Sequence, residues 1–294
     1  MTSRRSARVA GAMLGAIAVA AVAAPLLGAR APAAIGDVVG ARLLSPFSHD
    51  PAGALHLLGT DRLGRDLLAR TLLAGRVSLA VGVTGALLAG ALGVAVGAVA
   101  GWRRGPADRA LMALTDALLS IPRLVLLLLC VALWEPSLST VVIVLAATGW
   151  MGVARLTRAE VIAARGRPYV DAARALGAPS RRTLWRHVLP NALGPAIVAT
   201  TMGVGSAIML EAGLSFLGLG VQPPAASWGN MIAAGRDVVV TAPWVSLVPG
   251  LAVVMVTMCA TIVGDDLRDR LAGTRRTTVQ RTRIVTISRG PAVN

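Results

Sequence analysis

Few side chains in this sequence are of a type and spacing that could carry out chemistry. All 29 basic side chains are arginines, so the chain has no lysine for a Walker A phosphate loop or a Schiff base. Cys130 and Cys259 each lie alone in an apolar run, and His49, His56 and His187 show no ligand-like spacing with them. We therefore expect no catalytic site, no disulfide, and no cofactor or metal bound by this chain.

Three ionisable residues, Asp116, Arg123 and Glu211, lie inside apolar runs and are the candidates for a pathway or gate. An ionisable group within a membrane helix is a functional-site hypothesis, although a polar packing contact is the competing explanation. For Asp116 and Glu211 both interpretations stay open. Arg123 follows Ile121-Pro122, where a proline kink is expected, and it could pair with Asp116. A snorkelling structural arginine is favoured there over a solute contact.

A polar, arginine-rich segment, residues 169–190, interrupts the apolar runs. Pro168 suits the first position of a short helix, and Gly177 suits the residue just past its end. One apolar face of this helix would comprise Tyr169, Ala172, Ala173 and Leu176, with Asp171 opposite. A second short helix is expected from Pro179 to Pro190, with an apolar stripe of Leu184, Trp185, Val188 and Leu189. The two half-helices predict a hairpin that docks a partner.

The composition is that of a polytopic membrane protein. Of 294 residues, 55% are hydrophobic, and the mean hydropathy is +0.70. The net charge of +15 comes from arginines clustered between apolar spans, which favours contact with membrane lipid and argues against nucleic acid. Six apolar stretches could cross a bilayer, roughly 9–29, 77–101, 110–134, 138–154, 194–214 and 245–264. We expect an all-α fold, with the first stretch a retained anchor rather than a cleaved signal peptide.

The arginines also predict the orientation. With both termini in the cytoplasm, the cytoplasmic segments hold 21 of the 29 arginines and the two outer segments hold seven. The hairpin then lies in the cytoplasm. In the second stretch, small residues recur every four positions, which favours close helix packing and leaves a subunit seam as the alternative. They are Gly82, Ala86, Gly90, Gly93, Gly97 and Gly101.

The two outer segments are candidates for contact with other proteins. In residues 57–79, Thr60 or Asp61 could cap an amphipathic interfacial helix in which Asp66 pairs with Arg70. In residues 214–236, Pro223-Pro224 forbids helix, Ser227 can cap a new helix, and Trp228 would lie at the membrane interface. The second segment predicts the mouth of a pathway.

Four segments resemble those of a known family. The hairpin resembles the EAA loop of membrane subunits of ABC importers, with Asp171-Ala172-Ala173, Gly177 and Val188-Leu189-Pro190, and with Asp171 in place of the usual Glu. Leu58-Gly59-Thr60-Asp61 and Gly64-Arg65-Asp66 are similar to a signature of dipeptide, oligopeptide and nickel permeases. Residues 214–236 and the run from Gly264 to Asp269 resemble the same family, so the likeness covers nearly all of the chain.

This resemblance implies a type I importer transmembrane domain with six transmembrane helices and no enzyme activity. The expected parts are an anchor and outer segment (1–75), a permease core (76–265, EAA loop about 155–193) and a basic cytoplasmic tail (266–294). The implied partners are a second homologous permease, two cytoplasmic subunits or domains that bind ATP and Mg²⁺, and an extracytoplasmic substrate-binding protein. The partner-facing outer residues would be Thr60, Asp61, Gly64, Arg65, Asp66, Gln222, Pro223 and Trp228.

The implied location is the bacterial cell membrane, and the implied solute is a di- or oligopeptide, with nickel or another small solute as the alternative. A rival from another class is an ATP-independent secondary transporter. Such a protein needs a dense set of coupling acids within the membrane, and only Asp116 and Glu211 are available.

Overall fold

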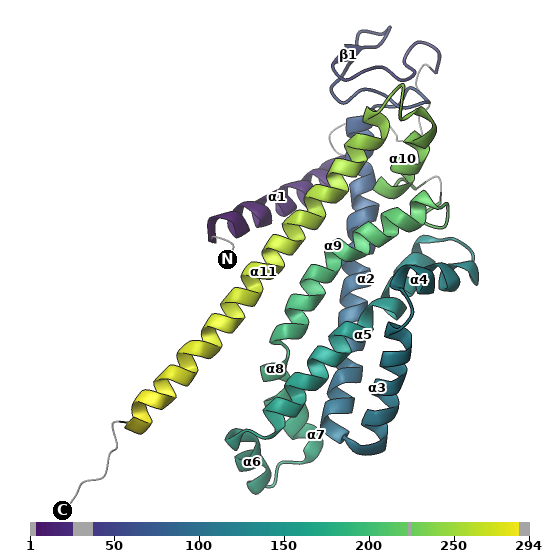
Figure 1. The fold of residues 1–294 in the computed structure, drawn as a ribbon. Helices are drawn as coiled ribbons and strands as arrows, with labels where there is room; N and C mark the ends of the chain where they lie inside the picture. Colours follow the sequence, from purple (N-terminus) through teal and green to yellow (C-terminus); the bar gives the residue numbers. More distant parts are fainter. Residues whose placement is uncertain (1–3, 26–37, 223–224, 288–294) are drawn as a thin grey trace, which may run out of the picture.

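The computed structural model describes residues 4–25, 38–222 and 225–287, with side chains up to residue 271. This part is mainly helical, as expected, and its two short strands pair at one end of the bundle (Figure 1). The long helices are α1 (Arg4–Ala23), α2 (Leu67–Arg103), α3 (Gly105–Leu119), α4 (Arg123–Ala132), α5 (Leu138–Arg165), α9 (Gly194–Phe216) and α11 (Trp244–Ile287). The short elements are β1 (Ser48–His49), β2 (Leu55–His56), α6 (Pro168–Ala175), α7 (Ser180–Thr183), a π-helical turn (Leu184–Val188), α8 (Leu189–Ala192), α10 (Trp228–Gly235) and a 3₁₀ turn (Arg236–Val238).

Helix α2 is the central element and packs against α5 on one side and α9 on the other. Its 37 residues contain no proline. At 1.5 Å per residue, the helix is about 55 Å long, which exceeds the hydrocarbon thickness of a bilayer. Asp66 caps its start, because its carboxylate accepts a hydrogen bond from the Ala69 amide at 2.8 Å. The predicted cap at Thr60 or Asp61 is therefore wrong.

Five helices of the described chain are long and apolar enough to cross a membrane, or six if the bent pair α3–α4 counts as one span. The pair bends by 92° because the α3 helix ends at Ser120 and Pro122 cannot continue it. The third predicted span, 110–134, is thus not one straight helix. The last helix also differs from the prediction, since α11 continues to Ile287 rather than ending near residue 264.

The bundle has two distinct ends (Figure 1). The first, the hairpin end, carries α6, α7, the π-helical turn and α8, together residues 168–192. At the opposite end lies the cap, which we define as residues 38–66 with α10 and the following 3₁₀ turn. The N-terminus of α2 lies beneath the cap, and its C-terminus reaches the hairpin, so α2 connects the two ends.

The small residues of α2 pack against helices of the same chain. A Cβ added at Gly93 would lie 2.6 Å from the Trp150 carbonyl oxygen and 2.6 Å from the Val153 Cβ of α5. Gly101 faces α5 in the same way, 2.8 Å from the Arg158 carbonyl oxygen. These approaches confirm the prediction of close helix packing, and the seam lies within this chain.

We expect Gly93→Leu to disrupt the contact between α2 and α5. The added side chain has no space, and overpacking in a well-packed seam costs roughly 1–3 kcal/mol or more. The measurement is the monodisperse fraction in fluorescence-detected size-exclusion chromatography after graded heating in detergent. Gly152→Leu is the matched control, because nothing lies within 4 Å of a Cβ added at that position of α5. Equal thermal profiles for the two variants would contradict the assignment of this seam.

Candidate functional site

The first half of the hairpin is the predicted helix. Helix α6 begins at Pro168, and the chain leaves it through Gly177, which has a φ of 79°. A positive φ is the conformation that glycine adopts without strain, so this residue turns the chain toward the second half of the hairpin. The sequence prediction of this helix is confirmed.

The second half of the hairpin is wound differently from the prediction. The π-helical turn from Leu184 to Val188 follows α7, and α8 then runs from Leu189 through Pro190 to Ala192. Pro190 therefore does not end the helix. It lies in the first turn of α8, where its missing N–H is not needed.

The apolar residues of the hairpin divide into a buried base and an exposed surface. Val170, Leu184, Val188 and Leu189 are buried against the ends of α2 and α5, where Ala98 and Val161 belong to the same cluster. By contrast, the exposed fraction is 37% for Tyr169, 88% for Leu176 and 58% for Trp185. Val170 anchors α6 on the bundle, and the predicted apolar face with Tyr169 and Leu176 is left exposed for a partner. Asp171 and Ala172 are exposed, and Ala173 is half-buried.

Trp102, near the end of α2, holds the hairpin in place. The guanidinium groups of Arg165 and Arg174 lie 5.4 and 5.3 Å from the centroid of its ring, within the range of a cation–π contact. The indole N–H donates to the Ser180 hydroxyl at 2.8 Å. The sequence analysis missed this residue, although a tryptophan at the end of a span that borders an arginine-rich segment is the signal that could have identified it.

Asp116 lies on the surface of α3 and does not pair with Arg123, which corrects that prediction. Its carboxylate accepts hydrogen bonds from Arg155 of α5 at 2.5 and 3.1 Å. A second ion pair joins the same two helices, in which Arg158 of α5 binds Asp108 of α3 through two hydrogen bonds of 2.5 and 2.8 Å. Both acids therefore tie α3 to α5.

Glu211 is fully buried in α9, where it forms a packing contact. Its carboxylate accepts hydrogen bonds from Ser215 at 2.7 Å and from Ser78 of α2 at 3.3 Å. The Ser78 hydroxyl in turn accepts the backbone N–H of Trp228 at 3.0 Å. Of the two roles left open for Glu211, the geometry favours helix packing, because the side chain connects α2, α9 and α10 and has no exposed surface.

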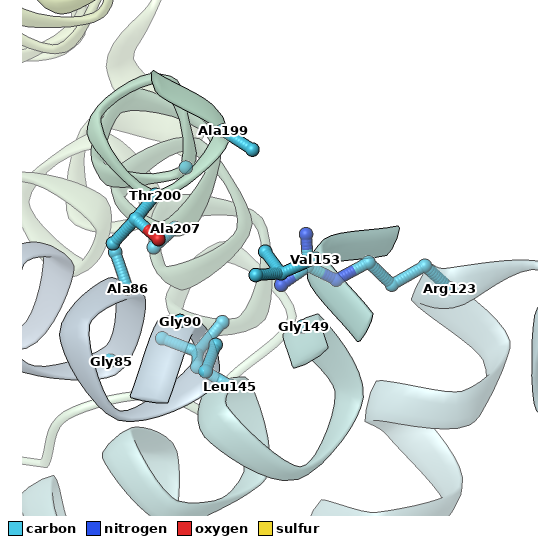
Figure 2. A pocket seen from close by; sticks show the side chains of 12 residues that line it. Gly85, Ala86, Gly90, Arg123, Leu145, Gly149, Val153, Ala199, Thr200 and Ala207 are labelled. Atoms are coloured by element: carbon cyan, nitrogen blue, oxygen red, sulfur yellow. The ribbon is translucent and has the colours of Figure 1, made fainter. Parts of the chain in front are cut away.

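Arg123 lies apart from the acids and points into a pocket between α2, α5 and α9 (Figure 2). Its side chain extends from the start of α4 toward Gly149 and Val153. The pocket volume is about 40 Å³. It is lined by Gly85, Ala86, Ala89, Gly90, Arg123, Leu145, Gly149, Val153, Ala199, Thr200, Gly203 and Ala207. Of the three predicted pathway residues, only Arg123 reaches this pocket.

The cap is organised around Asp61. Its carboxylate accepts the backbone N–H groups of Leu63 and Arg65 at 2.8 and 3.0 Å, and it forms ion pairs with the guanidinium groups of Arg65 and Arg70. Asp66 contacts the His56 ring at 2.8 Å instead of pairing with Arg70. The segment before Leu67 is thus a folded loop, and the predicted amphipathic helix begins only there.

Part of the predicted partner-facing surface is buried within the cap. Thr60, Asp61, Gly64 and Trp228 are buried, so the prediction that they face a partner is wrong. Arg65 and Asp66 are half-buried, Gln222 is exposed, and Pro223 lies outside the described residues. Ser227 caps α10 as predicted, with Asn230 completing a capping box.

One loop carboxylate of the cap has a shifted pKa. The backbone N–H of Ala54 donates to Asp50 at 2.8 Å, and this hydrogen bond lowers the pKa of Asp50 below its ordinary value. The carboxylate also lies 3.6 Å from the His56 ring. Asp50 is therefore ionised at neutral pH and fixes the turn beside the strand pair.

Comparisons with known proteins place this architecture in a family. The family model described as "Binding-protein-dependent transport system inner membrane component" matches residues 93–273. A peptide transport system permease protein of Brucella suis is 41% identical over 268 residues, which cover 91% of this chain and 88% of that protein. The oligopeptide transport system permease protein OppC of Bacillus subtilis is 38% identical over 221 residues, covering 75% of this chain and 72% of OppC.

The fold is also similar to that of a solved structure. A chain of the MetNI methionine ABC transporter in an inward-facing conformation superposes with a TM-score of 0.54 at 18% identity, over 66% of this chain and 93% of that chain. The likeness supports the helical arrangement of the core. Because the family model matches more than half of the chain and the relatives align over most of their length, this chain belongs to the binding-protein-dependent transport system inner membrane components.

Proposed function

We propose that this chain is the permease subunit of an ATP-driven importer of di- and oligopeptides and forms half of its translocation pathway. The relatives in Brucella suis and Bacillus subtilis are named as peptide and oligopeptide permeases, and they are similar over most of their length. The chain has no lysine for a phosphate loop. ATP and Mg²⁺ are accordingly bound by separate ATPase partners, and this subunit carries out no reaction itself.

The observation that carries this proposal is the exposed apolar surface of the hairpin. Tyr169, Leu176 and Trp185 project from a base that is packed onto α2 and α5. Large apolar side chains on a rigid support are the anchors with which a short helix binds a groove in a partner. The arginines around the hairpin favour a cytoplasmic location, so the partner is the ATPase.

The other partners follow from this arrangement. A second, homologous permease completes the pathway, and an extracytoplasmic binding protein delivers the solute to the cap end. ATP-driven closure of two ATPase subunits moves the two hairpins, and the bundles rock as rigid bodies between outward and inward access. Both termini of this chain then lie in the cytoplasm.

The hairpin variant Leu176→Asp/Trp185→Ala tests the proposal. Loss of two interface anchors is expected to reduce copurified ATPase at least roughly tenfold, because each anchor contributes more than about 1 kcal/mol. The measurement is vanadate-sensitive ATP hydrolysis after mild-detergent purification from the native membrane. The fold should be unaffected, since both side chains are exposed.

Val240→Asp is the matched control, because Val240 is 91% exposed at the opposite end of the bundle. This control should retain its ATPase. If wild-type protein brings down no ATPase, or if the hairpin variant retains the wild-type amount, the hairpin is not the coupling element and the importer proposal fails.

A further inference from the structure

We propose that Arg123 and its pocket bind the carboxylate of the transported solute part-way along the pathway, an inference that rests on the proposed function. The pocket lies near the middle of three spans, since it is lined by Gly85–Gly90 of α2, Leu145–Val153 of α5 and Ala199–Ala207 of α9. Both the hairpin and the cap are distant from it along these helices. The phosphates of lipid headgroups lie at the membrane surfaces and not at this depth.

The pocket is built to admit the guanidinium group. A Cβ added at Gly149 would lie 2.9 Å from the Arg123 Nη2 and 3.0 Å from the Ala89 Cβ, so any larger residue would displace the arginine. Figure 2 shows the side chain passing beside Gly149 into the space between the helices. The glycines and alanines of α2 and α9 leave this space open.

Arg123 carries an uncompensated charge within the part of the chain that the structure describes. Its Nε is buried and forms no hydrogen bond there, and no described carboxylate lies within ion-pair distance. The two acids of the adjoining helix α3 are already engaged, Asp116 with Arg155 and Asp108 with Arg158. Among the residues that line the pocket, Arg123 alone is charged.

An unpaired guanidinium at this depth is costly unless an anion joins it. The group presents parallel N–H donors in a fixed fork that matches a carboxylate. The pocket volume of about 40 Å³ is enough for roughly three water molecules, or for one carboxylate in their place. Every di- or oligopeptide carries a C-terminal carboxylate, so this site recognises a feature common to all such solutes and independent of their side chains.

The experiment compares uptake of a dipeptide library with uptake of the same library as C-terminal amides, in cells that produce the complete importer, with mass spectrometric detection. Uptake by each variant is divided by wild-type uptake of the same library, so any preference of the binding protein for acids or amides cancels. Arg123→Gln is expected to reduce uptake of the acids roughly tenfold and of the amides less than about twofold, because hydrogen bonds to charged groups contribute most when the carboxylate is present.

Three further variants complete the test. Arg155→Gln, which removes an exposed paired arginine, should change both libraries equally. Arg123→Lys keeps the charge but loses the fork, so it should retain part of the uptake of the acids and more than Arg123→Met does. This comparison decides the matter if wild type imports no amide. A matched loss for acids and amides, or equal loss in the Lys and Met variants, would overturn the assignment.

The remaining outcomes separate this inference from its premise. If Arg123→Gln loses its copurified permease partner, the counter-ion is an acid of that subunit and the solute site is refuted. If wild type imports neither library although it copurifies with an ATPase, the peptide substrate and this site both fail, and the coupling role of the hairpin stands.

Discussion

Asp61→Ala should unfold the cap at temperatures at which the wild-type protein is intact. The carboxylate is 5% exposed and binds two arginines and two backbone N–H groups. Its removal leaves the guanidinium of Arg70, itself 11% exposed, without its counter-ion. Breaking a buried ion pair on one side costs about 3–5 kcal/mol. The measurement is the midpoint of thermal unfolding in detergent, together with uptake in cells.

The matched control for this prediction is Asp237→Ala. Asp237 also pairs with a cap arginine, Arg62 at 3.2 Å, but its side chain is 62% exposed. An exposed pair contributes about 0–1 kcal/mol, so the midpoint should barely change. A double variant, Asp61→Asn/Arg70→Gln, should recover part of the loss, because the more deeply buried of the two arginines no longer lacks its counter-ion. A midpoint for Asp61→Ala equal to that of the control would refute the structural role of Asp61.

Trp228→Ala should detach α10 from the bundle. The ring is 1% exposed and lies against Gly75 of α2, where an added Cβ would be 3.0 Å from it. Its indole N–H donates to the Thr71 carbonyl at 2.8 Å. Truncation of a buried tryptophan lowers the free energy of unfolding by about 3–5 kcal/mol, because the burial of the ring is lost and a cavity remains in its place. Protease sensitivity of residues 217–243 is the measurement.

Trp134→Ala is the corresponding control, since Trp134 is 57% exposed beyond α4. It should leave the cleavage pattern unchanged. If cleavage after Trp228→Ala stays at the wild-type rate, the ring does not secure α10 and the buried position assigned to it is incorrect.

The sequence was informative where a local signal determines the structure. Pro168 starts α6 and Gly177 follows its end because each restricts or frees its own backbone. Ser227 caps α10 through a hydrogen bond to a residue only three positions away. The π-helical turn from Leu184 to Val188 carries no comparable signal. Its winding depends on how Leu184 and Val188 pack on α2 and α5, which only the folded structure determines.

The incorrect predictions arose where distant segments decide the contacts. Leucines spaced as in a helix concealed the loop before α2, because Gly59 and Gly64 adopt positive φ and fold the chain back. Arg123 was expected beside Asp116, but the 92° bend carries it away from α3. Trp228 was predicted to lie at the membrane interface because its local sequence gives no sign of its partners in α2, which lie some 150 residues earlier in the chain.

The continuity of α2 has a mechanical consequence. Its first turns hold the cap through Thr71 and Ser78, and its last turn holds the hairpin through Trp102. No proline interrupts the helix between these attachments. An unbroken helix transmits axial displacement along its full length, about 55 Å here, without a loop to absorb it. We therefore expect a movement of the hairpin to reach the cap through α2, so that the two ends of the protein move as parts of one rigid body.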